Sequence, residues 1–160
     1  MATSRSYFDF LLMFTEKKEL SRSLADALEQ SDTDPVAFFE ANKKAHFKNR
    51  GIIKPGHAEQ TLCYLLDVLG ENKLVVELDW KDDFEEVNAA IELLSGGKIE
   101  DIASEDDDED LFELLETVDD RLKKKGFTLL QFPLDSDSYP IAFASKKHGK
   151  ALQKMIDDLF

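Results

Sequence analysis

Residues 127–160 read FTLLQFPLDSDSYPIAFASKKHGKALQKMIDDLF, and this stretch decides the fold. FTLLQF (127–132) and YPIAFAS (139–145) are short runs rich in aromatic and apolar residues, which is typical of β-strands. The connection PLDSDS between them is rich in Asp and Ser, which favour turns because their side chains bond nearby backbone N–H groups. The last twelve residues place three apolar side chains on one helical face. The stretch therefore predicts a β-hairpin followed by a helix.

A third strand is predicted at residues 73–80, KLVVELDW. Every second residue is large and apolar: Leu74, Val76, Leu78 and Trp80. Successive side chains on a strand point to opposite faces, so this period indicates one buried face. Trp80 ends that face, and we expect its side chain to be buried with its indole N–H hydrogen-bonded.

Six further segments have the period of an α-helix: residues 6–14, 19–30, 32–51, 54–72, 82–97 and 104–126. Asp34 is a natural N-cap, Pro35 suits the first helical position, and Gly51 can end that helix. Ser104 is expected to cap the helix at 104–126, with Asp107 in the capping-box position. Together these elements predict an α+β fold, a helix-rich single domain over residues 1–160. Its sheet is expected to have about three strands, to include the C-terminal β-hairpin, and to be covered by helices on at least one face.

Charge is distributed unevenly along this acidic chain, whose net charge is -14. Residues 1–60 are neutral, residues 61–120 hold 21 acidic and 3 basic residues, and residues 121–160 hold 4 acidic and 8 basic residues. A concentrated negative field disfavours direct contact with nucleic acid and favours a basic protein surface as partner.

The densest acidic run, SEDDDED, begins at Ser104. Acidic residues favour a helix N-terminus, so the run can be a solvated helix start. However, the segment from Asp101 to Asp120 has eleven acids and no base, which is more than capping requires. The alternative is a partner-binding surface, with these candidate residues: Asp106, Asp107, Asp108, Glu109, Asp110, Glu113 and Glu116.

No catalytic motif is recognisable, and we predict no catalytic residue and no cofactor. The three histidines lie far apart in sequence and match no zinc-binding spacing. Cys63 lies within an apolar run and is interpreted as a small buried side chain.

The acids of the hairpin connection, Asp135 and Asp137, have two interpretations. They do not fit a calcium-binding EF-hand, because positions 5, 6 and 12 of such a loop would be Tyr139, Pro140 and Lys146. A turn is the favoured interpretation. The alternative is a divalent-metal site formed with two acids of the neighbouring strand, which would make the protein a metal-assisted hydrolase. Its ligands would be Glu77, Asp79, Asp135 and Asp137.

Two stretches, VVELDWKDDFEEV and LDSDSYPIAF, resemble a family of bacterial proteins catalogued only as a domain of unknown function. The resemblance covers about the second half of the chain. It implies a bacterial cytoplasmic protein and no particular activity.

The chain has a single cysteine, no apolar run near the roughly 20 residues that a membrane helix needs, and no recognisable signal peptide. We therefore expect a cytoplasmic protein without membrane contact. The predicted function is a non-enzymatic protein-interaction module that binds a basic partner. Such a partner is a toxin neutralised by an immunity protein, or a nucleic-acid-binding protein occupied by an acidic mimic.

Overall fold

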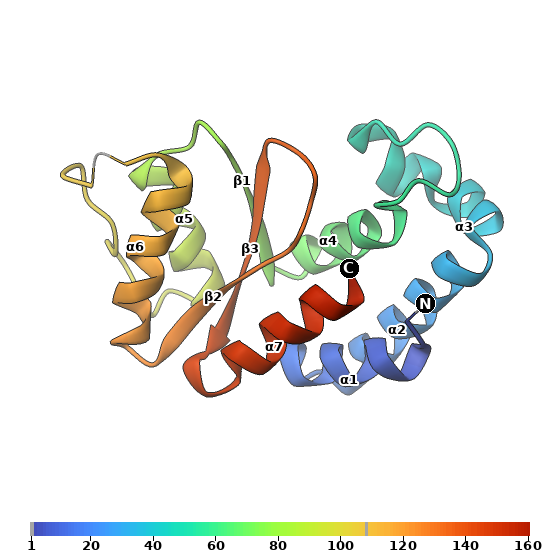
Figure 1. The fold of residues 1–160 in the computed structure, drawn as a ribbon, viewed down its shortest axis with the longest axis horizontal. Coiled ribbons are helices and arrows are strands. Elements are labelled where there is room, and N and C mark those ends of the chain that lie inside the picture. The colour runs from blue at the N-terminus through green and yellow to red at the C-terminus, as the bar shows by residue number, and fades with distance from the viewer. Residues whose placement is uncertain (1, 108) are drawn as a thin grey trace. The chain divides into compact units, whose positions relative to one another are not determined.

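The computed structural model describes residues 2–107 and 109–160. This part of the chain contains seven α-helices and one three-stranded antiparallel sheet (Figure 1), which confirms the predicted α+β class. The chain forms two compact units. The helical unit comprises Met1–Glu71 with Asp158–Phe160, and the sheet unit comprises Asn72–Asp157. The expectation that residues 1–160 form one domain stays a prediction.

The helical unit is built on α2 (Lys18–Thr33), which packs against α1 (Ser4–Thr15), α3 (Pro35–Asn42) and α4 (Gln60–Glu71). The leucines of α2 and α4 recur at helical spacing, and their buried faces form the core with the aromatic residues of α1 and α3. As predicted, Asp34 caps α3 by accepting a hydrogen bond from the backbone N–H of Ala37, and Cys63 is buried.

The helix predicted over residues 32–51 is not continuous. After α3 the chain forms a π-helical turn at Lys43–Phe47 and a 3-10 turn at Lys48–Arg50, and Gly51 ends the segment with a φ of 70°. The helix predicted over 54–72 begins only at Gln60, whose side-chain amide donates to the Ser31 hydroxyl and the Pro35 carbonyl. Burial of this amide against α2 and α3 fixes the start of α4.

The sheet unit contains β1 (Val75–Asp79), β2 (Phe127–Gln131) and β3 (Ser138–Ser145) in the order β1-β3-β2. Strands β2 and β3 form the predicted hairpin, with Leu129 opposite Phe143. Strand β1 pairs with the other edge of β3, with Leu78 opposite Tyr139. Three antiparallel strands are therefore present, as the sequence predicts.

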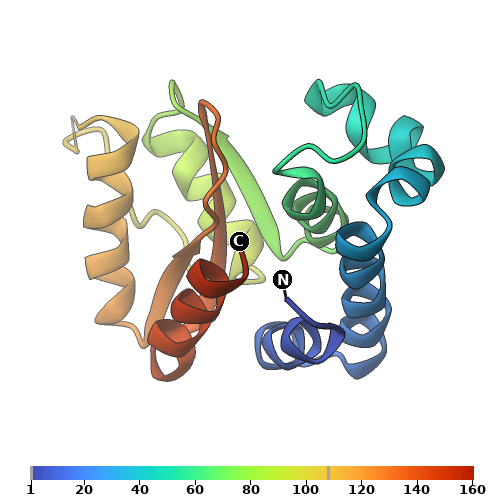
Figure 2. The same cartoon turned by 45° about the vertical axis from the view of Figure 1, so that its right-hand side comes forward.

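Helices cover both faces of this sheet within the unit (Figures 1 and 2). On one face, α5 (Phe84–Leu94) and α6 (Leu111–Lys123) bury a core that includes Leu78, Leu129 and Ile141. On the other face lies α7 (Lys146–Leu159), which begins three residues before the predicted helix. The approach of α7 to β2 is very close, because a Cβ atom at Gly149 would lie 2.2 Å from Cγ2 of Thr128.

The outer edge of β2 is hydrogen-bonded by side chains instead of a further strand. The carboxylate of Asp119 on α6 accepts from the backbone N–H of Leu129 at 2.9 Å. The side-chain amide of Gln153 on α7 accepts from the backbone N–H of Gln131 at 3.0 Å and donates to its carbonyl at 2.9 Å. Helices α6 and α7 are thereby tied to the strand between them.

The prediction for Trp80 is wrong, because its side chain is 54% exposed. Strand β1 ends at Asp79, and the turn that follows directs the indole away from the core. Val75, which the alternation placed on the solvent side, is instead buried. Val76 and Leu78 follow the predicted face: Leu78 is buried in the core beneath α5 and α6, and the half-buried Val76 packs against that core.

The predicted start of the helix at Ser104 is also wrong. Helix α6 begins at Leu111, and its N-cap is Asp110, whose carboxylate accepts from the backbone N–H of Glu113. Ser104 lies in a separate turn, in which its backbone N–H donates to the carboxylate of Asp107. The described residues of the acidic run therefore form a loop that leads into α6.

Candidate functional site

The acidic residues predicted to bind a partner divide into two groups. Asp106, Glu109, Glu113 and Glu116 are exposed on the loop or on the outward face of α6. Asp107 and Asp110 hold the local structure, as described below. Asp108 lies outside the described residues.

Asp107 forms an internal ion pair with Arg121 of α6. The guanidinium donates to both carboxylate oxygens at 2.7 Å, and also to the carbonyl of Ile102 at 2.9 Å. Only 11% of the Asp107 side chain is exposed. The hydrogen bonds from Arg121, followed by the one from the Ser104 backbone, lower the pKa of this carboxyl from its ordinary 3.8 to about 2. Asp107 is thus a structural clamp for the loop.

Two other acids of the run contribute to the structure of α6. Asp110 is its N-cap, and such caps stabilise a helix by about 1 kcal/mol. Glu109 accepts a hydrogen bond from the Thr117 hydroxyl at 2.8 Å on the exposed surface. Among the described candidate acids, Asp106, Glu113 and Glu116 are exposed and have no such role in the fold, which makes them suitable probes of a partner surface.

Phe112 is an exposed aromatic residue within this acidic surface. Its side chain is 49% exposed in the first turn of α6, directly beside Glu113. Phe112 and Glu116 are four residues apart and so lie on the same side of the helix. We name Asp106, Glu109, Phe112, Glu113 and Glu116 the acidic face. Sequence reasoning selected its acids but missed Phe112, because helical periodicity does not distinguish an outward apolar residue from a core residue.

The carboxylates of the alternative metal site are only partly brought together. Asp79 ends β1 opposite Ser138, and the backbone N–H of Trp80 donates to the carbonyl of Asp137 at 3.0 Å. Strand and hairpin connection are therefore neighbours. However, the Asp79 carboxylate accepts from the backbone N–H of Lys81, which commits it to the turn after β1.

Hydrogen bonds of the hairpin connection support a turn. The backbone N–H of Ser138 donates to the hydroxyl of Ser136 at 3.1 Å, and the two hydroxyls lie 2.8 Å apart. Among the described residues, no group of three or more His, Cys, Asp or Glu side chains is arranged to hold a metal ion. The geometry therefore gives the set Glu77, Asp79, Asp135 and Asp137 no support as a metal site.

Sequence reasoning missed a polar cluster in the helical unit. The guanidinium of Arg50 donates to one carboxylate oxygen of Asp67 at 2.7 Å, and Nδ1 of His46 lies 3.2 Å from the other. The imidazole also packs edge-on against Tyr64, with 4.8 Å between ring centroids. His46 lies in the π-helical turn and Arg50 in the 3-10 turn that follow α3. Arg50 lies 17 residues and His46 lies 21 residues before Asp67 in the sequence. No local sequence pattern could therefore indicate that the three side chains meet.

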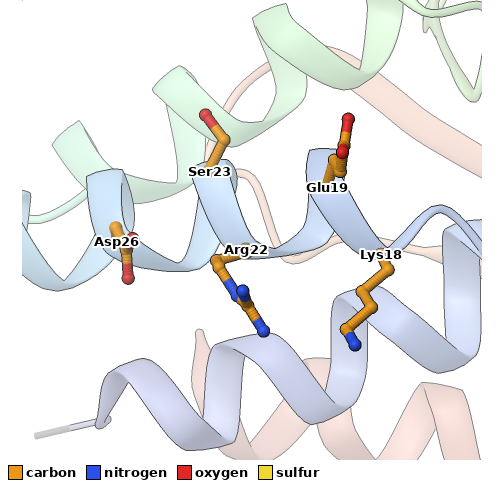
Figure 3. A pocket seen from close by; sticks show the side chains of 5 residues that line it. All are labelled: Lys18, Glu19, Arg22, Ser23 and Asp26. Carbon is orange, nitrogen blue, oxygen red and sulfur yellow. The ribbon is translucent and has the colours of Figure 1, made fainter.

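A hollow of about 590 Å³ runs along α2 and is lined by charged and polar residues. Figure 3 shows that Lys18 and Arg22 extend to one side of the helix, whereas Glu19 and Ser23 extend to the other. Asp26 is already bonded to the hydroxyl of Ser4. Because these groups do not converge, the hollow is a solvated helix face and not a binding site.

These features define a small acidic α+β protein, and no helix in its described part is long and apolar enough to cross a membrane. The chain belongs to the family described as Domain of unknown function (DUF6630), whose model matches residues 6–159. This match confirms the resemblance to a family of unknown function and extends it from the second half to nearly the whole chain. No curated protein and no solved structure matches the chain significantly.

Proposed function

We propose that this protein is a non-enzymatic interaction module whose acidic face binds a basic protein. The observation that carries the proposal is Phe112, an aromatic side chain left 49% exposed among Glu109, Glu113 and Glu116. Aromatic residues are enriched where interfaces derive most of their binding energy.

The charge around Phe112 indicates the chemistry of the partner. Residues 61–120 hold 21 acids against 3 bases, and the acidic face lies within this segment. Such a field accelerates the encounter with a positively charged surface more than it strengthens the final complex. The partner is therefore a basic protein with an apolar recess for Phe112. A toxin that is neutralised by an immunity protein has such a basic surface, and so does a nucleic-acid-binding protein that is occupied by an acidic mimic. We also propose that the protein is bacterial and acts in the cytoplasm.

Asp107 and Asp110 are not part of the proposed contact surface. Asp107 is bonded to Arg121, and Asp110 caps α6. Replacing either residue would change the fold and the surface together. A test of binding therefore uses Glu113 and Glu116, which have no such role, together with Phe112.

The first experiment replaces Phe112 with a photo-crosslinking phenylalanine analogue in the full chain, expressed in its native cytoplasm. Leu93, 45% exposed on α5, carries the same analogue as control. We expect a basic protein to be captured from position 112 and not from position 93. Capture of the same proteins from both positions would contradict the proposal.

The second experiment measures the affinity of the purified partner by calorimetry. The variant Phe112→Ala/Glu113→Gln/Glu116→Gln removes the exposed aromatic side chain and two surface charges. It should bind the partner at least about tenfold more weakly, because an aromatic residue at the centre of an interface contributes about 2 kcal/mol or more. The control Glu19→Gln/Glu92→Gln/Leu93→Ala removes two exposed glutamates and an exposed apolar residue elsewhere. Equal weakening in both variants would leave the acidic face without a specific role.

A further inference from the structure

A groove of about 670 Å³ lies along the outer edge of β2 and is lined by residues of α6, β2 and α7. Four lysines line it: Lys123 from α6, and Lys146, Lys150 and Lys154 from α7. Its two acids are Asp119 and Asp157. In a chain of net charge -14, this groove is therefore a local region of positive charge.

The lysines of α7 form one row. Lys146, Lys150 and Lys154 are spaced four residues apart, so they lie one above another on a single helix face. Like charges at this spacing destabilise a helix by about 0.2–0.5 kcal/mol per pair. Moreover, the first turn of α7 contains no acid, and cations there oppose the helix dipole. Helix stability therefore does not account for this row.

The positive charge of the groove is only partly neutralised. Lys123 forms an ion pair with Asp119 at 2.8 Å, and Asp119 also accepts from the Thr128 hydroxyl and the Leu129 backbone. No ion pair joins Lys146 or Lys150 to a carboxylate in the part of the chain that the structure describes. These two ammonium groups, one helical turn apart, are available for an anion.

The floor of the groove limits what can bind there. Asp119 bonds the outward N–H of Leu129, and Gln153 bonds both the N–H and the carbonyl of Gln131, so an extended peptide cannot pair with these backbone groups. A ligand must therefore be recognised by lysine ammonium groups and by the surface near Leu129 and Gly149. The volume is in the usual range of small-molecule sites, about 300–1,000 Å³.

We infer that this groove binds a small phosphorylated molecule, with its phosphate at Lys146 and Lys150. A phosphate dianion accepts charge-assisted hydrogen bonds from both ammonium groups and relieves their mutual repulsion. The groove and the acidic face use different residues. The two proposals are therefore independent, and an experiment that contradicts one leaves the other untouched.

Calorimetric titration with inorganic pyrophosphate, at ionic strength held constant with NaCl, tests the site. The wild-type chain should show saturable binding. Lys146→Gln/Lys150→Gln should weaken it at least about tenfold, because a hydrogen bond between charged groups contributes about 1.5–3 kcal/mol. The control Lys124→Gln/Lys125→Gln removes two exposed lysines just after α6 and should change the affinity less than about twofold. No saturation, or equal loss in both variants, would overturn the inference.

Two further readouts place and identify the ligand. In heteronuclear NMR, pyrophosphate should shift the amide of Gly149 and the side-chain amide of Gln153; shifts confined to other regions would overturn the assignment. Sedimentation with vesicles containing phosphatidic acid should leave the protein in the supernatant. Co-sedimentation that pyrophosphate abolishes would mean that the groove recognises a phosphorylated lipid headgroup, and would overturn the assignment of a small-molecule ligand.

Discussion

Arg121 donates hydrogen bonds to both carboxylate oxygens of Asp107, each at 2.7 Å, across fourteen residues of chain. The same guanidinium holds the carbonyl of Ile102, so one side chain of α6 fixes both ends of the Ile102–Asp107 segment. A bidentate pair of this kind is geometrically specific. The most acidic segment of the protein is therefore held in place by one of its few nearby bases.

This ion pair predicts a defined dependence of stability on pH. The pKa of Asp107 is lowered from 3.8 to about 2 by the hydrogen bonds from Arg121 and Ser104, so the folded state favours the ionised form. Its contribution is complete above about pH 4 and is lost as the pH falls toward 2. Urea midpoints measured from pH 2 to 6 should show a steeper acid loss for wild type than for Asp107→Asn. Parallel curves would contradict the clamp.

Gly149→Ala should destabilise the protein, although alanine is the better helix former. The new Cβ would lie 2.2 Å from Cγ2 of Thr128. Overpacking costs about 1–3 kcal/mol, whereas alanine gains roughly 1 kcal/mol over glycine in a helix. Denaturant unfolding measures the difference.

A second substitution tests this reason for the effect. Thr128→Ser removes Cγ2 but keeps the hydroxyl that donates to Asp119 at 2.7 Å. In the Thr128→Ser background, Gly149→Ala should therefore no longer destabilise, and the gain in helix propensity should appear. If the loss is the same in both backgrounds, the close approach of α7 to β2 is not its cause.

Asp67→Asn should reduce the free energy of unfolding by about 1.5–3 kcal/mol, the usual value of a hydrogen bond to a charged group. The reason is that the side chain of Arg50 is only 17% exposed and would lose its anionic partner. Glu40→Gln is the matched control, since Glu40 pairs with Lys43 on the exposed surface. Surface pairs contribute about 0–1 kcal/mol, so equal losses from both substitutions would contradict the distinction.

Trp80→Ala should cost no more than about 1 kcal/mol, because the side chain is 54% exposed. Its stacking with the ammonium of Lys81, 5.2 Å from the ring, is worth about 0.5–1 kcal/mol at an exposed site. Thermal and urea unfolding of the variant measure this cost. A reduction of the free energy of unfolding by about 3 kcal/mol or more would indicate that Trp80 is buried after all.

The sequence predicted the presence of helices and strands well, because hydrophobic periodicity is a local property. It predicted the residues at which they begin and end poorly. The hairpin and the buried position of Leu78 follow from patterns a few residues long. Trp80 continues the same pattern, yet β1 ends one residue earlier, where Asp79 pairs with Ser138 and a turn begins. The N-cap was predicted at Ser104, whereas Asp110 caps the helix and Asp107, predicted to complete a capping box, is bonded to the distant Arg121.

The functional sites were harder to predict because their members are distant in sequence. The acidic residues were visible as a run, but their separation into an ion pair, a cap and an exposed face depends on Arg121. The lysine groove joins α6 to α7, whose lysines begin 23 residues after Lys123. Composition shows the positive charge of residues 121–160, but only the fold brings four of these eight basic residues together along one groove.

Asp119 and Gln153 also have a consequence for the solubility of the chain. A sheet edge with unpaired backbone groups is a template onto which another copy can add a strand and begin aggregation. Here Asp119 bonds the outward N–H of Leu129, Gln153 bonds both backbone groups of Gln131, and Lys123 adds charge to the same edge. These bonds disfavour the addition of another strand to β2, and variants at Asp119 or Gln153 would expose the protein to self-association during folding at high concentration.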